Sequence, residues 1–286
     1  MKPRFCDLKS ILFVGLLAIY SNTFAQKINN TQQGNMWAPQ GIKIDGKLSE
    51  WGTELQAYNK TVKLWYSMAN DDKYLYLAIK SEELNYNPKI LAGGISLTIN
   101  TADRKRDKDA YVITYPIISR AGGFSRGGRG RRGGFGQDQD KPDTAAIVAQ
   151  QRQTLATGKE ISAIGFKEIT DTLISIYNEY GIKAAANIDD KGIYTAELAI
   201  PLAMLGIPTG QKEIAYNIKL NGLQLDMNKI AVGDGGAGRK ISISGGGGGF
   251  GGGFGGFSGR DTPDSDDITI ATDFWAKYAF ALSANK

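Results

Sequence analysis

Apolar and polar residues alternate along most of this chain, and this period of two constrains the fold more than any other feature. In the run YLYLAIKS at 74–81, every second side chain is a large aliphatic one or a serine. Successive side chains of a strand point to opposite faces, so such a run predicts a strand with two different faces. The acidic sequences NDDK (70–73) and DDKG (189–192) separate such runs, which is typical of β-hairpins.

The predicted fold class is all-β, an antiparallel β-sandwich of the jelly-roll or immunoglobulin type. One short helix is predicted over Thr144–Leu155, with Asp143 as its N-cap. No regular alternation of strands with helices appears, so parallel βαβ units are not expected. The predicted strands are Ile42–Asp45, Val62–Ala69, Tyr74–Ser81, Ile95–Thr101, Ala110–Ile117, Leu173–Glu179, Lys183–Ile188, Ile193–Pro201, Glu213–Asn221 and Trp275–Ser283.

Glycine is concentrated in two segments, 122–136 and 233–259, which hold 23 of the 37 glycines. Chains of this composition lose much entropy on ordering and bury little surface, so we predict disordered insertions at about 120–142 and 233–265. A sticky tether or a lid that contacts a ligand stays open as a role for their phenylalanines: Phe124, Phe135, Phe250, Phe254 and Phe257.

Residues 1–25 have the composition of a secretory signal, with a basic start, the apolar run Ile11–Ile19 and a small-residue cleavage site ending at Ala25. The apolar run is shorter than the roughly 20 residues that a membrane-spanning helix needs. We therefore expect an exported protein, periplasmic, on the outer surface or secreted, with no transmembrane segment in the mature chain. A linker at 26–40 and one sandwich domain at 41–286 are predicted to follow.

The chain contains no histidine, and its one cysteine, Cys6, lies in the predicted signal. This composition excludes Ser-His-Asp and Cys-His catalysis, and zinc or haem held by histidine. The net charge of +5 depends on one arginine-rich loop at 120–132, so the folded body is close to neutral and does not predict a nucleic-acid surface. A glycosidase needs only two carboxylates, but no such pair can be identified here. We expect no enzyme.

Three stretches, in this order, carry a resemblance to a known family: IKIDGKLSEWG (42–52), VKLWYSMANDDKYLYLAIKSEE (62–83) and GIYTAELAIPLAMLGI (192–207). They resemble family 9 carbohydrate-binding modules and related DOMON-like β-sandwich domains, and 213–222 and 274–283 fit the closing strands. The resemblance implies a jelly-roll-like sandwich, found in secreted sugar-processing proteins, with calcium as a structural ion.

Sugar-binding members of that family hold a terminal sugar between two tryptophans, and neither is present at the matching position. Lys89 follows the Asn87-Pro88 pair, and the stretch DDITIATDF (266–274) contains no tryptophan. Sugar binding still needs an exposed aromatic face with polar groups beside it. Trp51 is expected to plug one end of the sandwich, and of the neighbours Trp65 and Tyr66 one should be core and the other exposed. The predicted ligand-binding residues are Trp65, Tyr66, Tyr86 and Trp275.

Aspartates gather at the predicted turns and could supply oxygen ligands to calcium. Aspartate also stabilises hairpin turns through the backbone, so both roles stay open. The predicted metal ligands are Asp71, Asp72, Asp189 and Asp190, with a further acidic run at 261–267. Haem-binding relatives of the same sandwich can ligate iron through Met and Lys, which makes Met68, Met204 and Met227 candidate iron ligands, with core packing as the other interpretation for the first two.

The sequence thus predicts a non-catalytic exported binding module whose ligand is a carbohydrate. One alternative is an envelope structural or assembly protein that contacts a partner protein through the loops rich in Gly and Phe. A haem-binding relative of the same fold is the other alternative.

Overall fold

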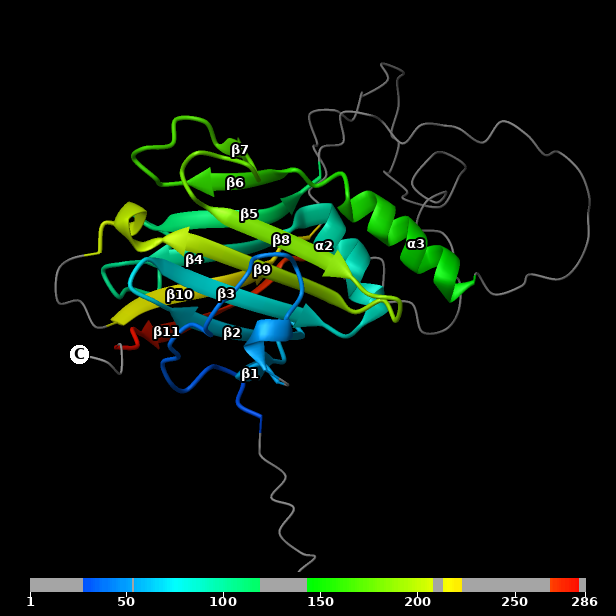
Figure 1. The fold of residues 1–286 in the computed structure, drawn as a ribbon, viewed down its shortest axis with the longest axis horizontal. Coiled ribbons are helices and arrows are strands. Elements are labelled where there is room, and N and C mark those ends of the chain that lie inside the picture. Colours follow the sequence, from blue (N-terminus) through cyan, green and yellow to red (C-terminus); the bar gives the residue numbers. More distant parts are fainter. Residues whose placement is uncertain (1–27, 53, 119–142, 208–212, 223–267, 283–286) are drawn as a thin grey trace, which may run out of the picture.

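Two antiparallel sheets pack face to face in the computed structural model, so the predicted all-β sandwich is confirmed (Figure 1). The structure describes residues 28–52, 54–118, 143–207, 213–222 and 268–282. In spatial order, the five-stranded sheet consists of β1 (Ala57–Asn59), β2 (Leu64–Asn70), β3 (Tyr74–Ser81), β9 (Tyr194–Pro201) and β8 (Lys183–Ile188). The six-stranded sheet consists of β11 (Thr272–Ala279), β10 (Glu213–Leu220), β4 (Ile95–Asn100), β5 (Tyr111–Ile117), β6 (Glu160–Ile164) and β7 (Leu173–Ser175).

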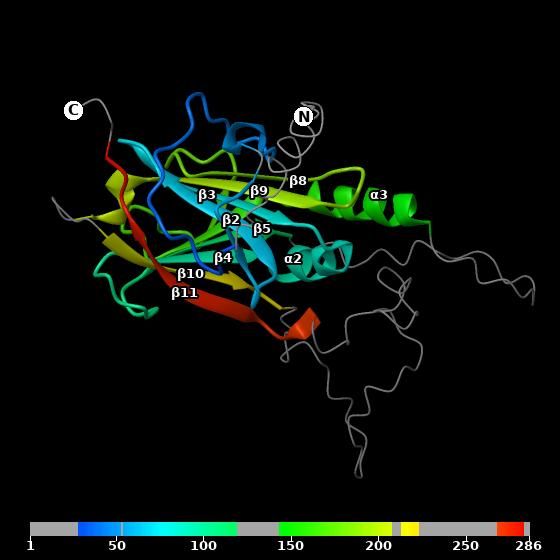
Figure 2. The same cartoon turned by 90° about the horizontal axis from the view of Figure 1, so that it is seen from below.

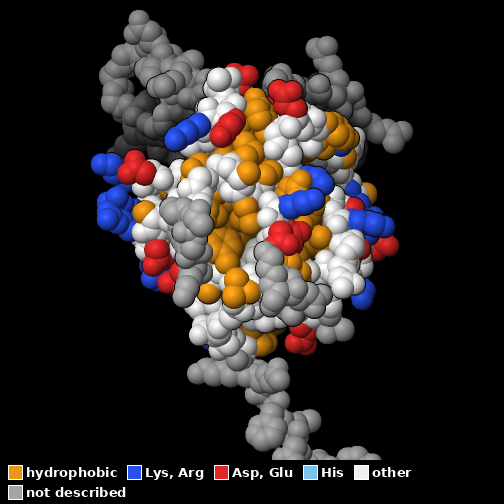
Figure 3. Space-filling view, turned by 60° about the vertical axis from the view of Figure 1, so that its left-hand side comes forward, with side chains coloured by type: hydrophobic (Ala, Val, Ile, Leu, Met, Phe, Trp, Pro, Cys, Tyr) orange, Lys and Arg blue, Asp and Glu red, His pale blue; other side chains and the backbone are white. Residues whose placement is uncertain are grey.

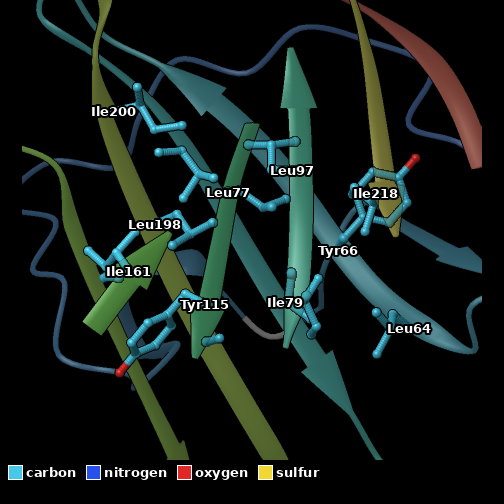
Figure 4. Packing of buried hydrophobic residues seen from close by; sticks show 14 of the residues in the cluster. Leu64, Tyr66, Leu77, Ile79, Leu97, Tyr115, Ile161, Leu198, Ile200 and Ile218 are labelled. Carbon is cyan, nitrogen blue, oxygen red and sulfur yellow. The ribbon is translucent and has the colours of Figure 1, made fainter. Parts of the chain in front are cut away.

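Large apolar side chains fill the space between the sheets (Figure 4). Leu77 and Ile79 on β3 and Leu198 on β9 lie opposite Leu97 on β4, and all four are buried. These are the apolar positions of the period-two pattern, so one face of each strand supplies the core. Each fully buried side chain of this kind stabilises the fold by about 1.5–3 kcal/mol.

Two α-helices lie at one end of the sandwich (Figures 1 and 2). The predicted helix is present as α3 (Thr144–Leu155), and a side-chain oxygen of Asp143 caps it by accepting the Ala145 N–H at 3.0 Å. The second helix, α2 (Asn87–Gly93), was not predicted; it has only seven residues and begins at an Asn-Pro pair. The short 3-10 helices are η2 (Ser49–Trp51), η3 (Leu84–Tyr86) and η4 (Leu202–Leu205). No helix within the described ranges is long and apolar enough to span a membrane.

Several predicted boundaries were wrong. The stretch 42–45 forms no strand, since it crosses the outer face of the five-stranded sheet and packs there through Ile42 and Ile44. The strand predicted at 173–179 ends at Ser175, whose carbonyl accepts the Asn178 N–H in a turn. Strands β1 and β6 were not predicted, because runs of three and five residues show little periodicity.

The expectation of a linker at 26–40 needs correction for residues 28–40, which pack along β1 and along the part of β2 that β1 does not cover. The side-chain amide of Gln32 accepts the backbone N–H of Met68 at 2.7 Å and donates to the Met68 carbonyl at 2.9 Å. Further along the edge, Asn70 donates its backbone N–H to Met36 at 3.0 Å. These contacts satisfy backbone groups that an edge strand would otherwise expose. The expected signal and both glycine-rich insertions lie outside the described residues.

Candidate functional site

Three side chains lie side by side on the outer face of the five-stranded sheet. Tyr58 on β1 is paired in register with Trp65 on β2, which is paired with Lys80 on β3. The ring centroids of Tyr58 and Trp65 are 5.1 Å apart, with 51° between their planes. The Lys80 Nζ lies 5.1 Å from the centroid of the Trp65 ring. All three side chains are half-buried, so the row presents an aromatic surface with a cation over the Trp65 ring.

A carboxylate completes this row. Glu82 Oε2 accepts the indole N–H of Trp65 at 3.1 Å, and Oε1 lies 2.8 Å from Lys80 Nζ. The hydrogen bond from Lys80 is the main cause that lowers the pKa of Glu82, so this carboxyl is ionised near neutral pH. We name Tyr58, Trp65, Lys80 and Glu82 the Trp65 patch. It combines an aromatic face with a hydrogen-bond donor and an acceptor.

A second ion pair flanks the patch. Lys63 Nζ lies 3.9 Å from Glu83 Oε2 and 4.6 Å from the centroid of the Tyr86 ring. Burial raises the pKa of Tyr58, and the negative charge of Glu83 adds to that effect. The surroundings of the patch therefore hold charges of both signs. The face at the left of Figure 1 is similarly mixed, with charged side chains of both signs around a central strip of hydrophobic ones (Figure 3).

Two of the predicted ligand-binding residues prove to be core residues. Tyr66 is fully buried between the sheets, with its hydroxyl 2.9 Å from that of Tyr216 and accepting the Gln32 N–H at 3.0 Å. Tyr86 is 8% exposed and belongs to the same core. Their assignment as ligand contacts is corrected accordingly. The expectation that only one of the neighbours Trp65 and Tyr66 is core is confirmed.

Trp275 is half-buried on β11, in the other sheet, so it is not part of the Trp65 patch. Tyr58 and Lys80 contribute to the patch but were not predicted. Alternation places Lys80 on the opposite face from Leu77 and Ile79, but it does not distinguish a ligand contact from an ordinary solvated lysine.

The expectation that Trp51 plugs one end of the sandwich is wrong. Trp51 is buried on the outer face of the five-stranded sheet, where its indole N–H donates to Glu197 Oε1 at 2.8 Å. Glu197 Oε2 accepts the backbone N–H groups of Asp45 at 3.1 Å and Gly46 at 2.9 Å. Burial raises the pKa of Glu197, a property that catalytic acids share. Because three donors of the 42–52 segment satisfy this fully buried carboxyl, its role is to hold that segment.

The predicted metal ligands lie at opposite ends of the five-stranded sheet. Tyr74, next to the Asp71 turn, pairs with Pro201, whereas the other end of β9, next to the Asp189 turn, pairs with the end of β3. In each turn the first aspartate accepts two of its turn's own backbone N–H groups, at 2.7–2.9 Å. No group of three or more His, Cys, Asp or Glu side chains that could hold a metal ion occurs in the described part of the chain.

The second aspartate of each pair lies closer to solvent. Asp72 is exposed, and Asp190 forms an ion pair with Arg152 at 2.8 Å. Calcium binding at these turns stays a prediction, and the acidic run at 261–267 lies outside the described residues. Met68 is fully buried in the core between the sheets and Met204 packs against that core, while Met227 lies outside the described residues.

No family model and no curated protein matches this chain. Among solved structures, it is similar to a family 9 carbohydrate-binding module from Caldicellulosiruptor kristjanssonii, solved in complex with glucose. The two chains are 7% identical, with a TM-score of 0.39, and the match covers 89% of this chain and 98% of that one. That module belongs to the family which the sequence resembles. By its own strand pairing, the present chain is an antiparallel β-sandwich.

Proposed function

We propose that this protein is a non-catalytic, exported carbohydrate-binding protein and that the Trp65 patch holds the ligand. The observation that carries the proposal is the half-buried indole of Trp65, with Tyr58 on one side and the Lys80–Glu82 ion pair on the other. The C–H face of a sugar ring packs on such an aromatic surface, and its hydroxyls need donors and acceptors at the edge. The signal-like composition of residues 1–25 supports the exported part of the proposal.

The patch is held in place before any ligand arrives. Trp65 lies on a strand that pairs on both sides, and its indole N–H is hydrogen-bonded to Glu82. A side chain that is already ordered loses little conformational entropy on binding, which favours affinity. The Lys80–Glu82 pair offers one hydroxyl an acceptor and its neighbour a donor.

Affinity electrophoresis tests the proposal, with hydroxyethyl cellulose, xylan, mannan and laminarin in separate gels. We expect at least one of these polysaccharides to retard the wild-type protein. The substitutions Trp65→Ala and Tyr58→Ala should weaken retardation about 3- to 10-fold in apparent affinity, because each removes part of the stacking surface.

Tyr177→Ala is the matched control, since Tyr177 is 81% exposed in the loop after β7 and lies outside the patch. It should migrate like the wild type. Thermal melts by circular dichroism check that each variant is folded, and Trp65→Tyr should recover part of the loss. Absence of retardation by all four polysaccharides, or equal retardation of wild type and Trp65→Ala, would reject the proposal.

A further inference from the structure

Trp65 and Trp275 lie on the two opposite outer faces of the sandwich. Their neighbours Tyr66 and Phe274 meet in the core, where their ring centroids are 5.3 Å apart. Adjacent side chains of a strand point to opposite faces, so each tryptophan points away from that contact. Because β2 and β11 belong to the two different sheet layers (Figure 2), the two indoles leave the molecule in opposite directions.

Polar groups surround Trp275 as they surround Trp65. Asn217 on β10 is paired in register with Trp275, and its side-chain amide donates to Asp273 Oδ2 at 2.6 Å. Asp273 and Lys277, two positions to either side of Trp275 on the same face of β11, are both exposed. We name Trp275, Asn217, Asp273 and Lys277 the Trp275 patch. An indole, an amide and a carboxylate lie on this face, and the Lys277 ammonium beside them is held by Asp103 at 2.6 Å and by Glu213 at 3.2 Å.

Core packing does not account for Trp275. Among the described residues, the two apolar clusters of the molecule include Phe274 and Trp65 but not Trp275. A large aromatic side chain on a strand face that also carries an ordered Asn–Asp pair has the features of a ligand contact.

We infer that the Trp275 patch is a second carbohydrate-binding surface, so that one molecule bridges two polysaccharide chains. This inference rests on the proposed function of the Trp65 patch. Two sugars bound in this way, one on each outer face, are separated by the full thickness of the sandwich. They must therefore belong to different polysaccharide chains or to distant parts of one chain. Two sites on one body also raise the avidity for a long polysaccharide above that of either site alone.

The test combines light scattering with affinity electrophoresis on the same four polysaccharides, for the wild type, Trp65→Ala, Trp275→Ala and the double variant. Wild-type protein should increase the scattering of the polysaccharide that retards it, because it cross-links chains. Each single variant should still be retarded, more weakly than the wild type, and should produce no increase in scattering. The double variant should migrate as it does in a gel without polysaccharide.

Asp273→Asn provides a second, milder change at the Trp275 patch, because it removes the charge of an exposed carboxylate but keeps a side-chain oxygen that can accept the Asn217 amide. It should reduce scattering while the thermal melt stays that of the wild type. Self-association of the free protein would also increase scattering, and that increase would remain in Trp275→Ala. Sedimentation of the protein without polysaccharide is the control for this effect.

Two results would overturn the second site while leaving the proposed function intact. One is complete loss of retardation in Trp65→Ala, and the other is unchanged retardation and scattering in Trp275→Ala. A Trp65→Ala variant that behaves like the wild type would instead reject the proposed role of the Trp65 patch. Failure of the wild type to bind any of the four polysaccharides would reject both.

Discussion

The indole N–H of Trp51 donates a 2.8 Å hydrogen bond to the carboxylate of Glu197, joining two segments that are 146 residues apart in the chain. The same carboxylate accepts the backbone N–H groups of Asp45 and Gly46, so the 42–52 segment is fastened to β9 at three points. Gly46 has φ +82°, and a Cβ there would lie 2.7 Å from the backbone of Ala186. Two of the stretches that carry the family resemblance thus hold each other in the fold.

Replacing Glu197 should therefore weaken the fold strongly. Glu197→Gln replaces one acceptor oxygen by a donor amide that faces N–H groups, so the free energy of unfolding should fall by about 1–3 kcal/mol in urea denaturation. Glu54→Gln, at an exposed position, should have almost no effect. With Trp51→Phe in a double-mutant cycle, the coupling energy should be about 0.5–3 kcal/mol. Purely additive effects would mean that the hydrogen bond between Trp51 and Glu197 contributes nothing.

The free energy of unfolding should also depend on pH through the Glu197 carboxyl. Burial raises the pKa of Glu197, so the folded state binds this proton more tightly than the unfolded state does. Its contribution to stability is fully present below about pH 4.3, the pKa of an unperturbed glutamate, and is lost as pH rises through the raised pKa. Glu197→Gln lacks this proton, so the stability gap between wild type and variant should shrink as pH rises through that window. A gap that stays constant or widens would contradict the assignment.

Gln32 takes the place of a neighbouring strand at Met68, in the part of β2 that β1 does not cover. Gln32→Ala leaves the N–H and carbonyl of Met68 without their partners, so we expect a loss of about 1–3 kcal/mol in the free energy of unfolding. Gln33→Ala is the matched control, because Gln33 is exposed and, within the described residues, its side chain bonds to its near neighbour Thr31. Chemical denaturation measures the free energy of unfolding of the wild type and of both variants. Equal stabilities would show that water replaces the glutamine at no cost.

The hydrogen bonds of Asp189 predict a role that does not need calcium. Its Oδ1 accepts two N–H groups of its own turn, so Asp189→Ala should lower the melting temperature by the same amount in EDTA and in calcium. The exposed Asp72 serves as the control position at the other turn. If the melting temperature of Asp189→Ala falls only when calcium is present, the calcium site predicted from the sequence is supported, and the hydrogen bonds within the turn do not explain the loss.

Periodicity predicted the parts of the fold whose pattern is local. The run at 74–81 became β3 with the same bounds, and Asp143 caps α3 because a short polar side chain before a helix satisfies a free N–H. Alternation also indicated that Trp65 and Tyr66 face opposite ways, but an aromatic pair does not reveal which one faces the core. That choice depends on Phe274 and Tyr216, which come from distant parts of the chain.

The candidate site was predicted only in part, for the same reason. Tyr58 lies on a strand of three residues, which has no readable period, and it reaches Trp65 through strand pairing rather than through sequence proximity. Tyr86 was predicted as a ligand contact, but it ends η3 just before α2, and neither of these short helices was predicted. Residues that meet across strands leave no local signal.

The indole N–H signals of the four tryptophans in a two-dimensional proton–nitrogen NMR spectrum test the central claim most directly. The hexasaccharides of cellulose, xylan, mannan and laminarin serve as probes, and the spectrum of Trp65→Phe assigns the Trp65 signal by its disappearance. At least one probe should shift the Trp65 signal, while the buried Trp51, held by Glu197, should stay in place. A Trp65 signal that does not move with any of the four probes would contradict carbohydrate binding at this patch.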